Sequence, residues 1–169
     1  REARAYLTAG APSTEQVLQE LSVFADAYQC IYDPPGTEDR ALVAAYERIR
    51  ALDITTAIPL LAWLRTVPSD QLSLAQHRRA VRAVESWALR RVFTGWQTRG
   101  YSTHLTKVLR NGKAAETKEI DIADAVIAGL QDGVLDWPTD DDLLEAFRTR
   151  KYYDAIAQRR IRLLLSAID

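Results

Sequence analysis

The sequence predicts an all-α protein, an irregular bundle of about eight helices. Three observations lead to this prediction. Apolar residues recur at spacings of three and four along most of the chain, which is the period of a helix with one buried face. Proline and glycine are sparse and fall between these apolar segments. No run of alternating Val, Ile or Thr residues is long enough to predict a strand.

The first two predicted helices are separated by Asp-Pro-Pro-Gly at residues 33–36, a turn sequence that favours an antiparallel hairpin. Ser13 can cap the first helix, with Gln16 as its capping-box partner. Each helix then has five apolar residues at helical spacing, which predict one buried stripe. The stripes are Val17, Leu21, Phe24, Tyr28 and Ile31 in the first helix, and Leu42, Ala45, Tyr46, Ile49 and Leu52 in the second.

Two central helices are expected next. Residues 55–67 are apolar nearly all round, so we expect this helix to be buried, with Pro59 tolerated in its first turn. Ser73 and Gln76 form a second capping box. They begin the longest predicted helix, at about residues 74–93, which Gly95 ends.

The rest of the chain predicts four shorter helices. The first three of these helices are expected to be capped by Ser102, Asp121 and Thr139, in that order. The helix that Ser102 caps is expected to end at Asn111-Gly112. Residues 154–169 form the fourth. The residues expected to face the core are Ile122, Val126, Ile127 and Leu130 in the second, and Ile156, Ile161, Leu164, Leu165 and Ile168 in the last.

Length and composition indicate one globular domain over residues 1–169, because a chain of this length with 47% apolar residues can bury a large core. No apolar run approaches the roughly 20 residues that span a bilayer, and no signal-peptide core is present, so we expect a cytoplasmic protein without membrane contact. The single cysteine, Cys30, forms no internal disulfide. The absence of methionine, together with an opening that resembles the end of a helix, predicts a fragment of a longer multidomain protein.

Charge is strongly segregated along the chain. Residues 77–113 contain nine Arg or Lys against one acid, a net +8, whereas residues 114–146 contain ten acids against one Lys, a net −9. The basic stretch includes Trp96, Tyr101 and His104, so it could follow a phosphate backbone and stack aromatic rings on bases. The basic and acidic stretches could instead pair within the domain and cancel each other's field.

No motif in the sequence predicts an active site. It has no Gly-rich phosphate loop, no HExxH and no GxSxG. His77 and His104 have no acidic neighbour at ligand spacing, and we expect them to be exposed or to cap a helix. Residues 140–142 are three consecutive aspartates whose side chains fan apart on a helix, unlike the spaced carboxylates of metal loops. We therefore expect no catalytic residue, metal or cofactor in this chain.

Residues 84–109, VESWALRRVFTGWQTRGYSTHLTKVL, resemble a segment in the N-terminal domain family of GmrSD-type restriction endonucleases and related SspE-like phage-defence proteins. In that family an Arg-Arg pair on a helix precedes a glycine break and a second helix. Residues 52–64 and 136–169 also resemble family segments, in the same order. The residues that we interpret as the structural signature are Glu85, Arg90, Arg91, Gly95, Trp137 and Pro138.

The resemblance implies a parent protein with a nucleotide-handling core and an HNH nuclease, using a nucleoside triphosphate and a divalent metal. Neither the Asp-Gly-Gln-Gln-Arg motif of that core nor the HNH histidines occur here. The implied role is a non-catalytic helical domain of a modification-sensing DNA restriction protein, a scaffold in contact with neighbouring domains and with DNA. The candidate DNA-contacting residues are Arg78, Arg79, Arg82, Arg99, Lys107, Arg110 and Lys113. The alternative is a protein–protein docking module with no nucleic-acid role.

The adjacent arginines need separate explanations, because successive helix residues point about 100° apart. Extending the apolar spacing of Val84, Trp87 and Ala88 by one turn reaches Arg91. We therefore expect Arg91 to be partly buried and paired, either with an acid of residues 114–146 or with helix-end carbonyls. Arg90 is expected to lean toward solvent.

Overall fold

The computed structural model describes residues 12–132, 135–152 and 156–165. These residues form eight α-helices and one short 3₁₀ helix and contain no strand, which confirms the all-α class. The helices are α2 (Thr14–Tyr32), α3 (Arg40–Ala51), η1 (Thr55–Ala57), α4 (Ile58–Thr66), α5 (Leu74–Thr94), α6 (Tyr101–Thr117), α7 (Ile122–Gln131), α8 (Asp140–Thr149) and α10 (Gln158–Leu165). None of these helices is both long and apolar enough to cross a membrane. The predicted helix end at the N-terminus and the closing Ile168-Asp169 pair lie outside the described residues.

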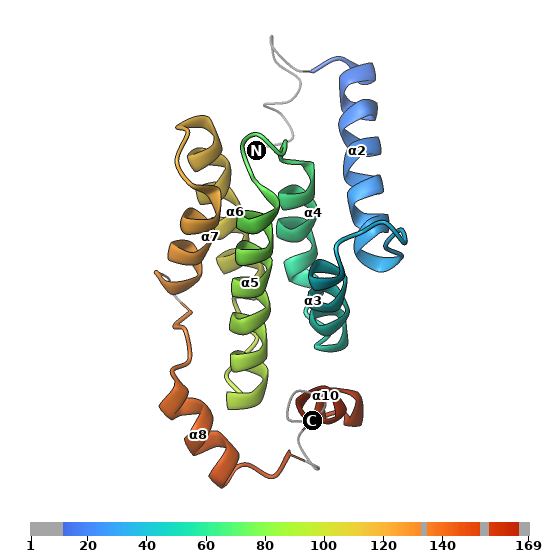
Figure 1. The fold of residues 1–169 in the computed structure, drawn as a ribbon. Coiled ribbons are helices and arrows are strands. Elements are labelled where there is room, and N and C mark those ends of the chain that lie inside the picture. Colours follow the sequence, from blue (N-terminus) through green and yellow to red (C-terminus); the bar gives the residue numbers. More distant parts are fainter. Residues whose placement is uncertain (1–11, 133–134, 153–155, 166–169) are drawn as a thin grey trace.

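Helix α5 lies at the centre of the bundle (Figure 1). It contacts α7, α3, α8 and α4, while α6 packs on α7 and α4, and α2 packs on the outer side of α4 and α3. The apolar faces of these helices meet in one main core that contains Tyr46, Leu61, Trp87 and Val126. A smaller core, built on Phe93 with two residues from the C-terminal part, lies where α5 ends.

The predicted helix ends are confirmed where short-range capping determines them. Capping boxes form at Ser13, Ser73 and Thr139, in each case with the residue three positions on. Asp121 caps α7 through its side chain. Gly95 follows the last residue of α5 with φ of +73°, a conformation that is strained for other residues.

The predicted bounds of α6 are wrong at both ends. The helix is preceded by Gly100 rather than capped by Ser102, and it continues through Gly112 to Thr117. A Cβ atom at residue 112 would lie 2.5 Å from the ring of Trp63 on α4. Gly112 therefore serves the close packing of α6 on Trp63 rather than the termination of the helix.

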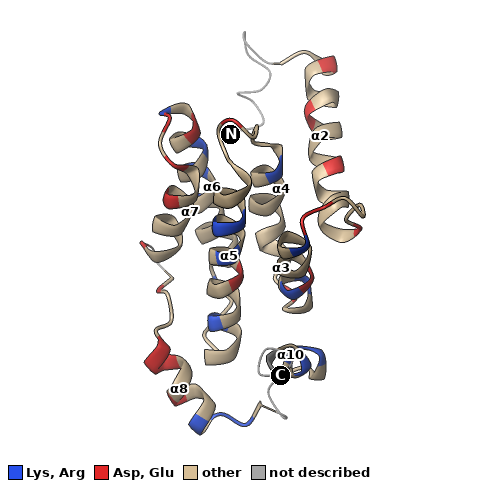
Figure 2. Ribbon diagram, in the orientation of Figure 1, with Lys and Arg blue, Asp and Glu red and all other residues tan. Residues whose placement is uncertain are grey.

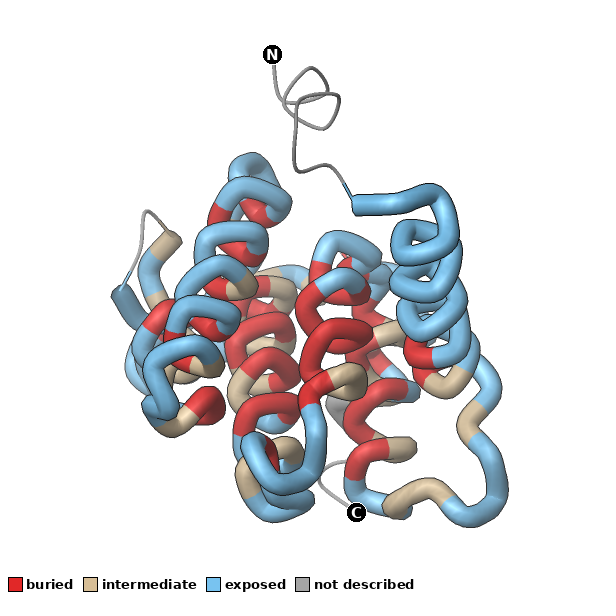
Figure 3. Tube along the Cα trace, turned by 90° about the horizontal axis from the view of Figure 1, so that it is seen from above, coloured by how far each residue is buried: buried red, intermediate tan, exposed pale blue. Residues whose placement is uncertain are grey.

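The predicted buried stripe of α2 is mostly exposed. Only Ala27 and Ile31 of this helix are buried, whereas the side chains of Leu21 and Tyr28 are 60% and 50% exposed. Figure 3 shows α2 almost entirely in the colour of exposed residues. The helical period is as predicted, but the described chain covers the stripe only near the C-terminal end of α2.

Candidate functional site

Arg91 is a buried cation that joins α5 to two loops. It donates to the Tyr101 hydroxyl over 3.2 Å, to the Gln97 carbonyl over 3.1 Å and to the Asp136 carbonyl over 2.9 Å. Three aromatic rings also surround its guanidinium, with centroids 5.2–5.6 Å from the guanidinium carbon: Trp87, Trp96 and Tyr101. Arg91 is 3% exposed and so is more deeply buried than predicted. Its acceptors are two loop carbonyls and a tyrosine hydroxyl rather than helix-end carbonyls or an acid.

Arg90 is also held, and the expectation that it leans toward solvent is wrong. Its side chain is 21% exposed, donates to the Pro138 carbonyl over 2.8 Å and forms an ion pair with Asp140. The chain passes back over α5 after α7 and places Pro138 and the first turn of α8 beside Arg90. The two arginines together fasten the connection between α7 and α8 onto α5.

The remaining signature residues have structural contacts of the same kind. Glu85 is buried and accepts two hydrogen bonds from Arg48 of α3. A Cβ atom at Gly95 would lie 2.1 Å from the guanidinium carbon of Arg150, which donates to the last carbonyls of α5. Trp137 is half-buried against the main core. The signature therefore holds α3, α5 and α8 together.

Two of the seven candidate DNA-contacting residues are neutralised by acids. Arg78 forms an ion pair with Asp39, and Arg79 forms ion pairs with Asp121 and Asp124, the latter over 2.7 Å. The Arg78 guanidinium lowers the pKa of the Asp39 carboxyl by hydrogen bonding to it. Pairing of the basic stretch with the acidic stretch, one of the two alternatives left open by the charge pattern, therefore accounts for Arg79 and Arg90, whereas the partner of Arg78, Asp39, lies outside residues 114–146.

Four other candidates are exposed. Lys107, Arg110 and Lys113 succeed one another at spacings of three on α6, and Arg99 lies in the turn before this helix. All four side chains are exposed, and within the described part of the chain none has an ion-pair partner. We call these four residues the α6 basic face. Arg82, the seventh candidate, lies apart from them on α5.

The aromatic residues of the basic stretch do not belong to this surface. Tyr101 and His104 are buried and pack on Trp87, with ring centroids 4.9 and 5.3 Å from its ring. Trp96 is half-buried beside Arg91. The prediction of an exposed or capping His104 is wrong, because this side of α6 packs on α5. Burial, with the positive charges of Arg91 and Lys107, lowers the pKa of His104.

A polar network between α3, α4 and α5 was not foreseen from the sequence. The Tyr46 hydroxyl lies 3.3 Å from Nε2 of His77, and Arg65 pairs with Glu38 over 2.7 Å. Burial lowers the pKa of His77 to about 4 and raises the pKa of Tyr46 to about 12, so both are uncharged at neutral pH. The partners are 31 residues apart, and no local motif indicates this pairing.

A groove of about 520 Å³ opens between α3, α5, α8 and α10. Arg48, Arg82 and Arg90 line it together with apolar residues such as Leu89 and Phe147. Two of the three arginines are already paired with carboxylates. The lining includes Ser86 and Glu85, but Glu85 accepts from Arg48, and in the described structure no hydrogen bond joins the Ser86 hydroxyl to this carboxylate. No three His, Cys, Asp or Glu side chains in the described residues converge as metal ligands.

Comparison of the chain with protein-family models, curated proteins and solved structures gives no match. The resemblance to GmrSD-type proteins therefore depends on the sequence motifs alone.

Proposed function

We propose that this chain is a non-catalytic helical domain of a cytoplasmic, GmrSD-like DNA restriction protein, and that it contacts the DNA backbone through the α6 basic face. One observation carries this proposal: four exposed cations fall within residues 99–113, and none is neutralised by a described acid. Such cations can replace the counterions condensed on DNA, which is the main source of sequence-independent affinity.

The burial of the neighbouring aromatic rings favours backbone contact over base recognition. Tyr101 and His104 have almost no exposed surface on which a base could stack. The affinity should therefore depend weakly on DNA sequence. The domain would act as a scaffold that brings DNA to the nucleotide-handling core and the nuclease of the parent protein, where a nucleoside triphosphate and a divalent metal would bind.

Fluorescence anisotropy of a labelled duplex of about 20 base pairs tests this proposal. Four phosphate contacts give a slope of roughly −3.6 for log K against log salt concentration, and a fourfold rise in salt then weakens binding by about 100-fold. An affinity that is absent at low salt, or that does not change with salt, would contradict backbone contact. The docking alternative, with no nucleic-acid role, would then be preferred.

Matched triple variants locate the contact. The variant Lys107→Gln, Arg110→Gln, Lys113→Gln should make the salt slope shallower by about 3. The control variant Arg40→Gln, Arg148→Gln, Lys151→Gln removes the same charge from exposed positions outside α6. If the two variants reduced the salt slope of DNA binding equally, binding would depend on the net charge of the chain rather than on the α6 basic face.

A further inference from the structure

The groove between α3, α5, α8 and α10 has, among the described residues that line it, one cation without an acidic partner. The described lining carries three arginines against one acid, Glu85. Arg48 is paired with this carboxylate, and Arg90 is paired with Asp140 of α8. Arg82 has no ion-pair partner in the described structure. The groove therefore keeps one positive charge that a ligand can neutralise.

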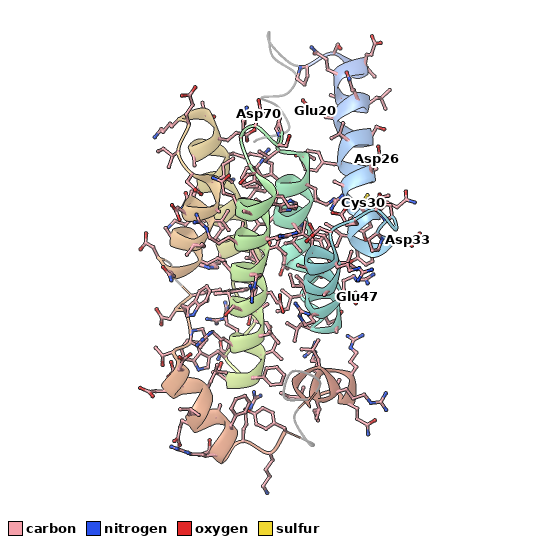
Figure 4. The ribbon with its side chains drawn as sticks, viewed as in Figure 1. Glu20, Asp26, Cys30, Asp33, Glu47 and Asp70 are labelled. Atoms are coloured by element: carbon pink, nitrogen blue, oxygen red, sulfur yellow. The ribbon has the colours of Figure 1, made fainter. Side chains whose placement is uncertain are left out.

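The acid nearest in sequence to the arginine of α3 does not cancel this charge. Glu47, which Figure 4 labels on α3, is exposed and does not line the groove, although it precedes Arg48. Successive helix residues point about 100° apart, so the two side chains face different ways. Figure 2 shows blue segments on both α3 and α5, which pack side by side. A carboxylate from a ligand would complement Arg82, because a guanidinium can donate two parallel hydrogen bonds to it.

The part of the groove toward α8 is apolar. Phe93 of α5 packs on Phe147 of α8 with ring centroids 6.2 Å apart, and Leu89 and Leu143 pack against Phe93. All four residues line the groove. Phe147 is 41% exposed, so this wall offers apolar surface that a ligand can remove from water.

The charge and the apolar wall lie at opposite ends of one helix face. Arg82, Leu89 and Phe93 follow one another on α5 at spacings of seven and four, which keeps them on the same side of the helix. The eleven residues from Arg82 to Phe93 correspond to a rise of roughly 16 Å. The groove volume of about 520 Å³ is ordinary for a small-molecule site. This shape fits an elongated molecule with a charge at one end only.

We propose that the groove binds a small organic monoanion with an extended apolar tail, its carboxylate at Arg82 and its tail against Phe147. One negative charge is the number that fits, because carboxylates of the protein already neutralise the other two arginines of the described lining. The proposal does not depend on DNA contact, since no residue of the α6 basic face lines the groove.

Titrations of the ¹⁵N-labelled full chain with octanoate, decanoate and neutral octanol, followed by NMR, test the proposal. Octanoate should bind about tenfold more tightly than octanol, and added salt should reduce this difference, because the two differ in the charged group. Decanoate should bind about tenfold more tightly than octanoate, because it buries two more methylenes. Equal binding of octanoate and octanol, or no saturable binding of decanoate in the millimolar range, would overturn the proposal.

One variant tests the charged end of the groove. Arg82→Gln should weaken octanoate binding about tenfold and leave octanol binding unchanged. Arg110→Gln is the matched control, since Arg110 is an exposed arginine of the α6 basic face and lies outside the groove lining. It should weaken DNA binding but not octanoate binding, so that failure of one proposal can be told from failure of the other. Equal losses of octanoate affinity in the two variants would refute the assignment to Arg82.

A second variant tests the apolar end. Phe147→Ser should weaken octanoate and octanol alike, by about fivefold or more. Leu144→Ser and Leu21→Ser are the controls, since both leucines are exposed and neither lines the groove. A loss as large in either control would place the tail elsewhere and overturn the proposal. If circular dichroism shows that Phe147→Ser disturbs folding, Arg82→Gln remains decisive, because Arg82 is exposed and has no ion pair within the described residues.

Discussion

Replacement of Arg91 by alanine removes the cation that joins α5 to the segment before α8. The change deletes three hydrogen bonds and leaves the carbonyls of Gln97 and Asp136 and the hydroxyl of Tyr101 without this donor. Only the bond to Tyr101 is buried, so leaving this hydroxyl without a donor costs about 1–3 kcal/mol, while the carbonyls of Gln97 and Asp136 belong to exposed residues and each of their lost bonds costs about 1 kcal/mol. Loss of the contacts with three rings adds to this, while removal of a desolvated charge offsets part of it. We expect the free energy of unfolding to fall by about 4 kcal/mol.

The adjacent Arg90 provides the matched control. Its bond to the Pro138 carbonyl contributes about 1 kcal/mol, and its ion pair with Asp140 contributes about 0–1 kcal/mol because the Asp140 side chain is 83% exposed. Arg90→Ala should therefore cost about 1–2 kcal/mol. The difference between the variants is about 2–3 kcal/mol, equivalent to roughly 4–12 °C in the thermal midpoint for a chain of this size.

Urea unfolding, followed by far-ultraviolet circular dichroism and by tryptophan fluorescence, measures both free energies. The slope of free energy against urea should be the same in both variants, so that the midpoints can be compared directly. Arg91→Lys should fall between wild type and Arg91→Ala, since an ammonium keeps the charge but does not reproduce the planar fork of donors. Equal midpoints for Arg90→Ala and Arg91→Ala would refute the assignment of the larger structural role to Arg91.

Two further predictions concern packing and pH. Gly112→Ala should lower the free energy of unfolding by about 1–3 kcal/mol, because the new Cβ atom would lie 2.5 Å from the ring of Trp63. Gly129→Ala, where the nearest atom is 3.4 Å away, should be neutral or stabilising, and equal effects in urea unfolding would contradict the packing argument. Burial lowers the pKa of His77 to about 4 from about 6.5, so the unfolded chain takes up the proton first and stability falls as pH drops through this window. Between pH 7 and pH 5 wild type should lose about 2 kcal/mol more than His77→Gln, and parallel pH profiles would refute this account.

Much of the fold could be predicted because its signals are local. The capping boxes at Ser13, Ser73 and Thr139 join residues three apart, and the left-handed conformation of Gly95 depends on its own backbone. The period of the apolar residues likewise predicts each helix from its own sequence. The failure at Gly112 has the opposite cause: its role depends on Trp63, which is distant in sequence, so the same residue type was interpreted as a helix end.

The candidate site was predictable only as a set of charges. The sequence determined how many cations residues 77–113 contain, but not which of them acids would neutralise. Arg79 is paired with Asp121 and Asp124, more than 40 residues away, while Lys107 and Arg110 have no such partner in the described structure. The polar contact of Tyr46 with His77 is a further case in which no local pattern indicates the partner.

The sequence by itself determined the all-α fold class, the position of most helix ends and the apolar face of each helix. These features depend on residues within a turn or two of one another. Only the tertiary structure decided which faces obtain a partner. The apolar stripe of α5 is buried between neighbouring helices. The equally regular stripe of α2 is exposed at every position before Ile31. Likewise Arg90 and Arg91 became structural contacts because the chain returns over α5 after α7 and places the acceptors of residues 136–140 beside them. Burial and ion pairing depend on which elements meet in space, and periodicity within one helix does not contain that information.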